Sequence, residues 1–503
     1  MKAIILAAGT GSRLRPLTEK LPKSMVRVNG KQILAHQIDA YLNAGLKKES
    51  IYIAVGYKSE FIVDFISQNY KGVNVVVNQE YSTTNNMYSL YLSLEEIGFD
   101  NKNGLFISNG DCVYSVPVIK KLMDDPRPNL IAAEKGVHNE ESMKITLQNG
   151  KINDISKQIT DQVAYGVSID LYKLGSQAVR NLTKIIEDYI FNQKQRNLWT
   201  EVALKNLLGK EDFEPMDIRG EKWVEIDNMD DLTLADRLFS DFNLKSKRCF
   251  IFDLDGTVYL GTEPITGTIN FIRDHMRDGK DIYFMTNNTS KLPADYVKRL
   301  KNFDLEIEQN MVISPVFPLI EHLKNNELKN IFLVANSGFS SYLKAAIPGI
   351  KLTDESSDCQ AIVLAYDTEL TYEKLRAASI LLQNNKNLIY LATHSDMVCP
   401  TESGNIPDIG TMITTIELTT GKKPDLIFGK PNPELLQHLG AKYKSDEMVL
   451  VGDRLYTDKK LADNIGCDFV CVLSGETRRE DVEDLRDEKF PALIVKHLGE
   501  IID

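Results

Sequence analysis

The chain has 503 residues and a formal net charge of −12, with 26% charged and 43% hydrophobic residues. This length allows two or more ordinary domains, and the composition is typical of globular proteins. The negative charge argues against a general nucleic-acid-binding protein and against binding to an anionic membrane. No apolar run approaches the ~20 residues of a transmembrane helix, so we expect no membrane insertion. Six cysteines without a CxxC pair favour reduced thiols in a cytoplasmic protein.

The first half of the chain alternates short β-rich runs with amphipathic segments. This alternation predicts an α/β fold with a doubly wound, mainly parallel sheet. Asn149-Gly150 lies between two alternating runs and predicts a hairpin with a type I′ turn. The expected strands are 2–7, 51–55, 73–77, 105–108, 130–133 and the hairpin strands 144–148 and 151–155, and the expected helices include 32–44 and 59–68.

A second α/β pattern begins at Arg248 with the stretch CFIFDLDGT, a new apolar strand followed by a polar loop. We therefore predict two domains, residues 1–240 and 248–503, joined by a linker at 241–247. Each domain is expected to contain a doubly wound, mainly parallel sheet. Ligands of such sheets bind at the carboxyl ends of the strands, so both sites should lie there.

The loop after the first strand combines glycines with cations. Gly9 and Gly11 would let backbone N–H groups approach a phosphate, and Arg13, Arg15 and Lys23 follow closely. A triphosphate needs several fixed cations while its α-phosphorus is attacked. The alternative is a solvated basic surface loop.

The full string LAAGTGSRLRPLTEKLPK resembles the motif of sugar-phosphate and phosphocholine nucleotidyltransferases. The resemblance implies a Rossmann-like nucleotidyltransferase domain in which Arg13 and Lys23 act on the triphosphate. It also implies that Asp111 and Asp227 hold Mg²⁺, for which carboxylates are suitable ligands. Asn109 stands where relatives often have a further Asp. A helix N-cap is the alternative role for Asp227.

The stretch NQEYSTTNNMYSLYLSLEEIG resembles the phosphocholine cytidylyltransferase branch of this family. It implies that CTP is the donor and a small phosphorylated alcohol the acceptor. The residues implied for binding are Ala8, Gly9, Gly11, Asn85 and Asn86.

Three aromatic residues offer a cation-binding box for a choline-like head group, with ordinary packing as the alternative. They are Tyr189, Trp199 and Trp223. Relatives in the wider group use phosphoethanolamine, aminoethylphosphonate, glycerol phosphate or sugar phosphates. A UTP- or dTTP-dependent enzyme acting on a sugar phosphate therefore stays an alternative.

The second half places polar groups after four apolar strands, in the order that a phosphoaspartate site needs. Two acids spaced by two can attack phosphorus and transfer a proton. A hydroxyl, a fixed cation and an acidic pair for a metal follow. The residues are Asp253 and Asp255 in FIFDLDGTVY, Thr286 and Asn287 in IYFMTNN, Lys430 in DLIFGKP, and Asp453 and Asp458 in EMVLVGDRLYTD.

This set resembles the haloacid dehalogenase superfamily, in particular its p-nitrophenylphosphatase-like branch with a large α/β cap. The resemblance implies that Asp253 is the nucleophile and Asp255 the general acid/base. Thr286 and Lys430 would hold the phosphoryl group, and Asn287 would contribute to substrate binding. Asp453, Asp253 and the backbone of Asp255 would bind Mg²⁺, with Asp458 as an acid that supports the metal.

The cap is expected at about residues 291–422, where it would close over the site. His394 and Asp396 lie near its loop NIPDIGTM. We expect His394 to serve in packing or substrate contact.

The sequence as a whole favours a bifunctional cytoplasmic enzyme with Mg²⁺ in both domains. Its substrates would be CTP, a small phosphorylated alcohol and a small phosphate ester, with no nucleic-acid partner. A homo-oligomer is compatible with this interpretation. A regulatory protein with one inactive domain is the rival hypothesis.

Overall fold

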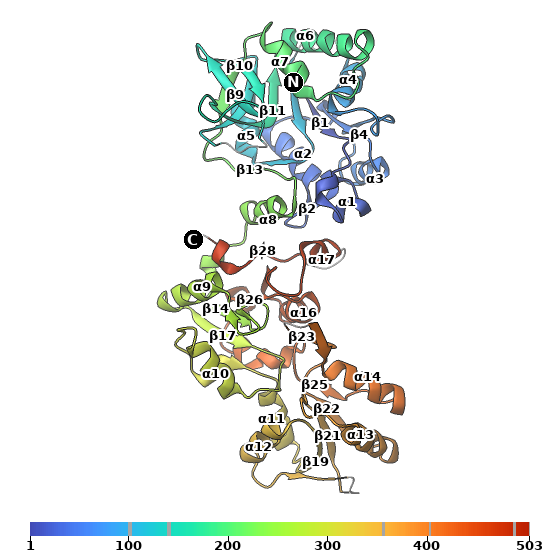
Figure 1. Ribbon diagram of the computed structural model, residues 1–503, viewed down its shortest axis with the longest axis vertical. Helices are drawn as coiled ribbons and strands as arrows, with labels where there is room; N and C mark the ends of the chain where they lie inside the picture. Colours follow the sequence, from blue (N-terminus) through green and yellow to red (C-terminus); the bar gives the residue numbers. More distant parts are fainter. Residues whose placement is uncertain (99–102, 138–141, 355–357, 402–403, 486–488, 502–503) are drawn as a thin grey trace. The chain divides into compact units, whose positions relative to one another are not determined.

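The computed structural model describes the chain except residues 99–102, 138–141, 355–357, 402–403, 486–488 and 502–503. The chain divides into two compact units, Met1–Ser240 and Asp241–Asp503 (Figure 1). Within the described residues, no helix is long and apolar enough to cross a membrane.

Unit 1 is built on a mixed sheet of order β10-β9-β11-β6-β1-β4-β5, with β8 and β12 beside β11. The strands around β1 are parallel, whereas β11 runs antiparallel to β6, β8 and β9. The strands are β1 (Lys2–Ala7), β4 (Ile51–Val55), β5 (Asn74–Val77), β6 (Leu105–Asn109), β8 (Leu130–Lys135), β9 (Lys144–Gln148), β10 (Lys151–Ser156), β11 (Gly166–Leu174) and β12 (Glu214–Asp217).

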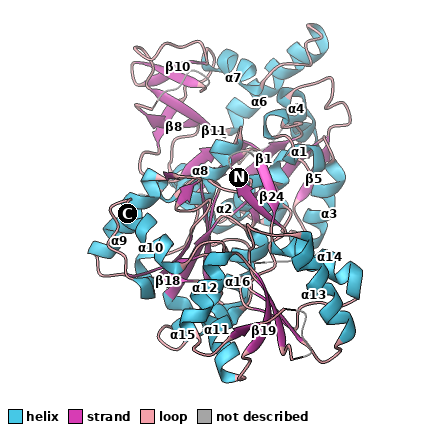
Figure 2. Cartoon of the chain, turned by 60° about the horizontal axis from the view of Figure 1, so that its bottom comes forward, coloured by secondary structure: helices cyan, strands magenta, loops and turns pink. Residues whose placement is uncertain are grey.

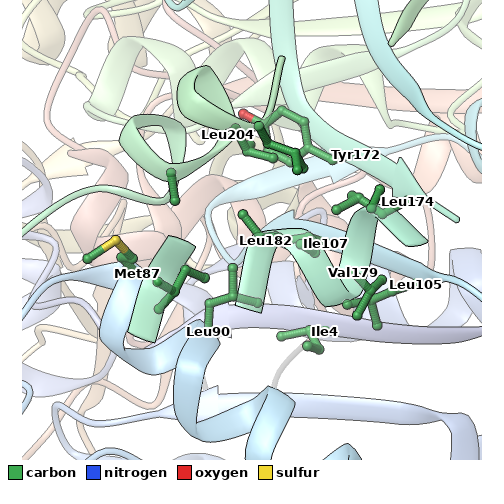
Figure 3. Packing of buried hydrophobic residues seen from close by; sticks show 14 of the residues in the cluster. Ile4, Met87, Leu90, Leu105, Ile107, Tyr172, Leu174, Val179, Leu182 and Leu204 are labelled. Carbon is green, nitrogen blue, oxygen red and sulfur yellow. The ribbon is translucent and has the colours of Figure 1, made fainter. Parts of the chain in front are cut away.

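Helices cover both faces of this sheet (Figure 2). Side chains alternate along β1, so that Ile4 and Leu6 enter one core while Ala3 and Ile5 enter the other. Figure 3 shows the first core, where helix side chains pack onto the strands. Each fully buried side chain of this kind contributes about 1.5–3 kcal/mol. One face carries α4 (Asn86–Ile97), α6 (Ser176–Glu187) and α7 (Thr200–Leu208), and the other α2 (Ile33–Ala44), α3 (Ser59–Asn69) and α5 (Val116–Asp124).

The predicted hairpin is confirmed, since β9 and β10 pair antiparallel. Asn149 and Gly150 both have positive φ, 53° and 78°. A type I′ turn requires this left-handed conformation at both central positions, which Asn-Gly adopts with little strain.

Unit 2 contains a parallel sheet of order β18-β17-β14-β26-β27-β28, which we call the core sheet. Its strands are β14 (Cys249–Asp253), β17 (Asp281–Met285), β18 (Val312–Ile313), β26 (Met448–Gly452), β27 (Asp468–Val472) and β28 (Leu493–Val495). One face packs against α9 (Thr266–Arg277) and α10 (Pro293–Lys301), and the other against α15 (Gln437–Gly440), α16 (Lys460–Ile465) and α17 (Arg479–Glu483).

A second parallel sheet in unit 2, the cap sheet, has the order β20-β19-β21-β22-β25. Its strands are β19 (Asn330–Val334), β20 (Lys351–Leu352), β21 (Ala361–Leu364), β22 (Ile389–Ala392) and β25 (Leu426–Ile427). Helices α11 (Val316–Asn325) and α12 (Ser337–Ala346) cover one face, and α13 (Tyr372–Asn384) and α14 (Ile409–Thr420) cover the other.

The predicted cap boundaries, 291–422, are wrong at both ends. Tyr296 and Leu300 of α10 are buried against the core sheet, and β18 pairs with β17 of the core sheet. At the other end, β25 pairs with β22 and belongs to the cap sheet. Hydrophobic pattern alone does not tell which of two sheets a short strand joins.

The segment 241–247, which we predicted as a linker, lies within unit 2. Leu244 is buried in the core-sheet cluster. Lys247 Nζ lies 2.6 Å from Asp468 Oδ2 and also donates to the backbone oxygen of Asp446. The segment is therefore packed onto the second unit by apolar contact and by a partly buried ion pair.

Candidate active sites

A pocket of about 300 Å³ opens at the carboxyl ends of β1 and β6 in unit 1. The structure brings nine of the residues predicted for this half to its wall: Ala8, Gly9, Gly11, Arg13, Lys23, Asn85, Asn86, Asp111 and Asp227. Ser24, Asn109 and Gly110 complete this side of the pocket. A volume of this size is that of a small-molecule site.

The loop after β1 depends on Gly11, which has φ +62°. A Cβ at this position would lie 2.7 Å from Lys23 Cβ, so a side chain would push the lysine away. Thr18 Oγ1 donates to the backbone oxygen of Gly11 at 2.8 Å. The loop therefore brings the stem of Lys23 against its own backbone and directs the ammonium group to the strand ends.

Lys23 is the centre of an ion cluster in this pocket. Its Nζ lies 2.8 Å from Asp111 Oδ2 and 2.8 Å from Asp227 Oδ1, and Arg13 Nη2 also lies 2.8 Å from Asp227 Oδ1. Burial by itself would lower the pKa of Lys23, but the two carboxylates raise it above its ordinary value. Burial likewise opposes ionisation of Asp227, yet Lys23 and Arg13 hold the pKa of its carboxyl below the usual value.

Two local features bring Asp227 to Asp111. Strand β13 (Trp223–Glu225) pairs antiparallel with β7 (Cys112–Tyr114), so the residues just beyond them meet. Helix α8 (Met229–Leu238) is capped by Asn228, whose Oδ1 accepts from two backbone N–H groups. The alternative N-cap role for Asp227 is therefore wrong, because Asn228 fills it.

Three acids around this cluster, Glu225, Asp170 and Glu201, were not predicted from the sequence. Oxygens of Glu225, Asp111 and Asp227 lie within 4.8 Å of one another. Burial, followed by the charges of its acidic neighbours, raises the pKa of Glu225 to about 9. The other two acids, Asp170 and Glu201, both accept from Tyr172 OH, at 3.1 and 3.2 Å. Glu225 lies two residues before Asp227 in the stretch WVEID, so the sequence does contain a signal for it.

Asp170 is an unusual residue for its position. It lies in a fully buried, mainly apolar strand, where the pairing of β11 with β8 shifts register, and its φ is +55°. Asn109 Nδ2 donates to its Oδ2 at 2.8 Å. Burial raises the pKa of Asp170 to about 7, with the charges of Glu201 and Asp111 adding to the effect. An acid in a mainly apolar strand is a signal that could have marked it.

The aromatic box predicted from Tyr189, Trp199 and Trp223 is wrong as a single site. Tyr189 packs against the core on one face of the sheet, and Trp223 packs against the core on the other. Trp223 Nε1 instead donates to Glu134 Oε2 at 2.8 Å, while Trp199 is about half exposed beside Lys157. Spacing in the sequence cannot show on which face of a sheet an aromatic side chain lies.

Unit 2 has a smaller pocket of about 30 Å³ at the carboxyl ends of β14 and β17. Five of the predicted residues line it: Asp253, Asp255, Thr286, Asn287 and Lys430. Lys430 Nζ forms a buried ion pair with Asp253 and lies 2.7 Å from Asp458 Oδ1. Burial raises the pKa of Asp255, which favours a carboxylic acid that can donate a proton.

Asp453 follows β26 and lies in a cradle of glycines. A Cβ on Gly475 would lie 1.9 Å from Asp453 Oδ2, and one on Gly256 would lie 2.4 Å from it. The backbone N–H of Glu476 donates to the same oxygen at 2.7 Å. Carboxylate oxygens of Asp453, Asp253 and Asp458 lie within 4.8 Å of one another. Among the residues that the structure describes, the side chain of Asp255 does not belong to this group.

The oxygen donors of both sites fit Mg²⁺, which prefers carboxylate ligands and retains bound water. The unit 1 set is Asp111, Glu225 and Asp227, and the unit 2 set is Asp253, Asp453 and Asp458.

The cap supplies part of the unit 2 pocket, through side-chain contacts that the sequence did not predict. Asp396 Oδ1 accepts from Asn287 Nδ2 at 3.1 Å, and its Oδ2 lies 3.1 Å from Arg454 Nη1. Asp408 and Cys399 also line the pocket. His394 is buried and its Nε2 lies 3.0 Å from Asp408 Oδ1.

Comparisons with known proteins agree with this division of the chain. Residues 2–129 match the family model described as nucleotidyl transferase. Residues 250–347 match a model of haloacid dehalogenase-like hydrolases, and residues 427–501 match a second model of that kind.

Three relatives illustrate the similarity. The 5'-nucleotidase YutF of Bacillus subtilis is 28% identical over 262 residues, which are 52% of this chain and 99% of that protein. An acid sugar phosphatase of Staphylococcus aureus is 29% identical over 48% of this chain and 92% of its own length. The solved structure of a 4-nitrophenylphosphatase from Thermotoga maritima is 38% identical over 51% of this chain and 97% of its own, with a TM-score of 0.47.

Fold, site and family models thus define an enzyme with two phosphate-handling domains. The chain carries an N-terminal nucleotidyl transferase domain, and its second half carries haloacid dehalogenase-like hydrolase domains.

Asp170→Asn tests the buried acid network. An acid whose pKa is raised by folding supports stability that is present below its ordinary pKa, near 4, and lost as pH rises through about 7. Asparagine cannot ionise, so the Tm advantage of the variant should grow by at least about 2 °C from about pH 4.5 to pH 8, the shift that ~1 kcal/mol produces in a unit of this size.

Tryptophan fluorescence measures this Tm for unit 1 alone, because both tryptophans, Trp199 and Trp223, lie there. Asp64→Asn, at an exposed position of the same unit, is the control and should show no such growth. A Tm difference that is constant over this pH range would show that Asp170 does not carry the buried proton.

Gly475→Ala tests the cradle of Asp453. The new Cβ would displace the carboxylate, so we expect phosphatase turnover to fall by about 10- to 100-fold, as for other losses of support around a metal ligand. Gly440→Ala, where a Cβ meets nothing within 4 Å, is the matched control. Full activity of Gly475→Ala in a steady-state phosphate-release assay would contradict the geometry.

Proposed function

We propose that unit 1 transfers CMP from CTP to a small phosphorylated alcohol and releases pyrophosphate. The observation that carries this proposal is one pocket joining the Gly9–Gly11 loop, the Lys23 ion cluster and the Asn85–Asn86 segment. The loop and the cations suit a triphosphate, and the Asn-Asn segment carries the resemblance to phosphocholine cytidylyltransferases.

In this reaction the acceptor's phosphate oxygen attacks the α-phosphorus in line, and pyrophosphate leaves. Arg13 and Lys23 neutralise the charge that develops on the phosphate oxygens. Asp111 and Asp227, with Glu225, would hold Mg²⁺, which supplies charge neutralisation at the phosphates when bound. Asn85 begins α4, with its Oδ1 accepting from the N–H of Asn86, so both amides are fixed at the pocket wall.

The acceptor side of the pocket adjoins buried acids. Asn86 Nδ2 lies 3.5 Å from Asn109 Oδ1, and Asn109 in turn binds Asp170. Because oxygen acceptors surround this part of the pocket, an amine or hydroxyl head group suits it better than a further anion would. A sugar phosphate with UTP or dTTP is the second candidate for this pocket.

We propose that unit 2 hydrolyses a small phosphate monoester through a phosphoaspartate. Asp253 attacks phosphorus, and Asp255 donates a proton to the leaving alcohol oxygen. Asp255 then accepts a proton from the water that hydrolyses the phosphoaspartate, which regenerates Asp253. Thr286 and Lys430 orient the phosphoryl group, and Mg²⁺ at Asp253, Asp453 and Asp458 supplies charge neutralisation when bound.

A small substrate is supported by the pocket of about 30 Å³ under the cap residues Asp396, Cys399 and Asp408. The relatives named as acid sugar phosphatase and 4-nitrophenylphosphatase are in keeping with a small phosphoester. Two phosphate chemistries on one chain favour successive steps of a single route, in which the phosphatase spares the acceptor of unit 1.

A matrix of nucleotides and acceptors tests the unit 1 proposal. Pyrophosphate release is measured for CTP, UTP and dTTP, each with phosphocholine, phosphoethanolamine, aminoethylphosphonate, glycerol phosphate and a sugar phosphate. We expect CTP with one of the small acceptors to give the highest rate. Release with no combination would reject the transferase, and a preference for UTP or dTTP with sugar phosphate would select the second candidate.

Paired variants separate the two activities. Asp253→Asn removes the nucleophile and should reduce phosphate release from small phosphoesters by at least about 100-fold, while pyrophosphate release stays unchanged. Asp227→Asn should do the reverse, because it removes a carboxylate of the unit 1 cluster. Loss of both activities in either variant, with native tryptophan fluorescence, would contradict two independent sites.

A further inference from the structure

Lys23 in unit 1 contacts two carboxylates of the group that could hold a divalent cation. Its Nζ lies 2.8 Å from Asp111 Oδ2 and 2.8 Å from Asp227 Oδ1, the two carboxylates whose oxygens also belong to the metal-binding group. A cation cannot bind both oxygens while the ammonium group lies between them, because the two charges would repel each other at close range.

The four groups of the cluster that are joined directly by ion pairs carry balanced charges without a metal. The four groups are the carboxylates of Asp111 and Asp227, the ammonium of Lys23 and the guanidinium of Arg13, and they sum to zero. A divalent cation added to this set leaves two excess positive charges in a partly buried pocket. A triphosphate, which carries several negative charges, would remove the excess and attract Lys23 away from the carboxylates.

The surroundings allow the lysine to move in this way. The ammonium group has three donors, and the two carboxylates use two of them. Gly11 holds the first carbons of the side chain, since its missing Cβ leaves the space that they occupy. The head group lies at the wall of a pocket of about 300 Å³ that also contains the phosphate-binding loop, so rotation about the outer bonds suffices.

We propose that Lys23 occupies the place of the divalent cation between Asp111 and Asp227 until a nucleotide arrives, so that metal and nucleotide bind together. This inference rests on the proposed nucleotide site of unit 1. It makes Lys23 a competitor of the metal in the free enzyme and a phosphate ligand in the complex. Free metal is then bound weakly, and the metal site fills only when the nucleotide is present.

The test measures Mn²⁺ binding to the full chain without nucleotide, from the decrease of the free Mn²⁺ signal in electron paramagnetic resonance. Asp453→Asn is included in every variant to weaken the unit 2 metal set. Lys23→Met keeps most of the side-chain volume but removes the charge, and we expect it to bind Mn²⁺ at least about 5-fold more tightly than the parent. Lys23→Arg keeps the charge and should bind Mn²⁺ as weakly as the parent.

Lys31→Met is the matched control, because Lys31 pairs with Asp39 away from the pocket and loses the same charge. Arg13→Gln is a second variant in case Lys23→Met does not fold, and it should tighten Mn²⁺ binding less, since the Arg13 side chain is 57% exposed. Unchanged or weaker Mn²⁺ binding in the folded Lys23 or Arg13 variant would overturn the proposal. Because the test uses the metal alone, its result is independent of the pyrophosphate assay that decides the proposed function.

Discussion

A buried ammonium group shared by two carboxylates is the interaction on which both sites depend. Lys23 joins Asp111 to Asp227, and in unit 2 a lysine joins two acids whose side chains are at most 7% exposed. Removing one member of the unit 2 set leaves an uncompensated buried charge, at a cost of about 3–5 kcal/mol, whereas the unit 1 set is partly exposed to water. The loops that carry these residues are therefore fixed to one another by the same charges to which we assign phosphate binding in the proposed functions.

The parallel sheets make these shared contacts possible. Strands β1 and β6 are neighbours, as are β14 and β26, so loops distant in sequence begin at the same edge. Glycine then permits the close approach. Gly11 passes against Lys23, and Gly475 leaves the space that the Asp453 carboxylate fills. The positive charge of the shared lysine and the space that these glycines leave together explain why the acids of each site can lie so close together.

The sequence predicted those parts of the molecule that depend on short-range pattern. The strand positions, the Asn-Gly hairpin and the phosphate-handling motifs all follow from local spacing, and the structure brings the motifs of each half to one pocket. The predictions from the sequence were wrong where packing between distant segments determines the structure. Tyr189 and Trp223 lie on opposite faces of one sheet, and β18 joins the core sheet instead of the cap. The contact of Asp396 with Arg454 likewise depends on how cap and core loops meet.

Asp170 shows how a site residue can oppose the preferences of its own strand. A left-handed backbone conformation and a buried carboxyl are both unfavourable, and strain of this kind costs on the order of 1–3 kcal/mol. The register shift of β11 against β8 permits the conformation, and Asn109 and Tyr172 donate to the carboxyl. Because Asn109 also lines the pocket, this strained acid is connected to the wall that an acceptor would contact. Stability alone gives no reason for an ionisable group at this position, and its link to the pocket wall through Asn109 supports the unit 1 activity proposed above.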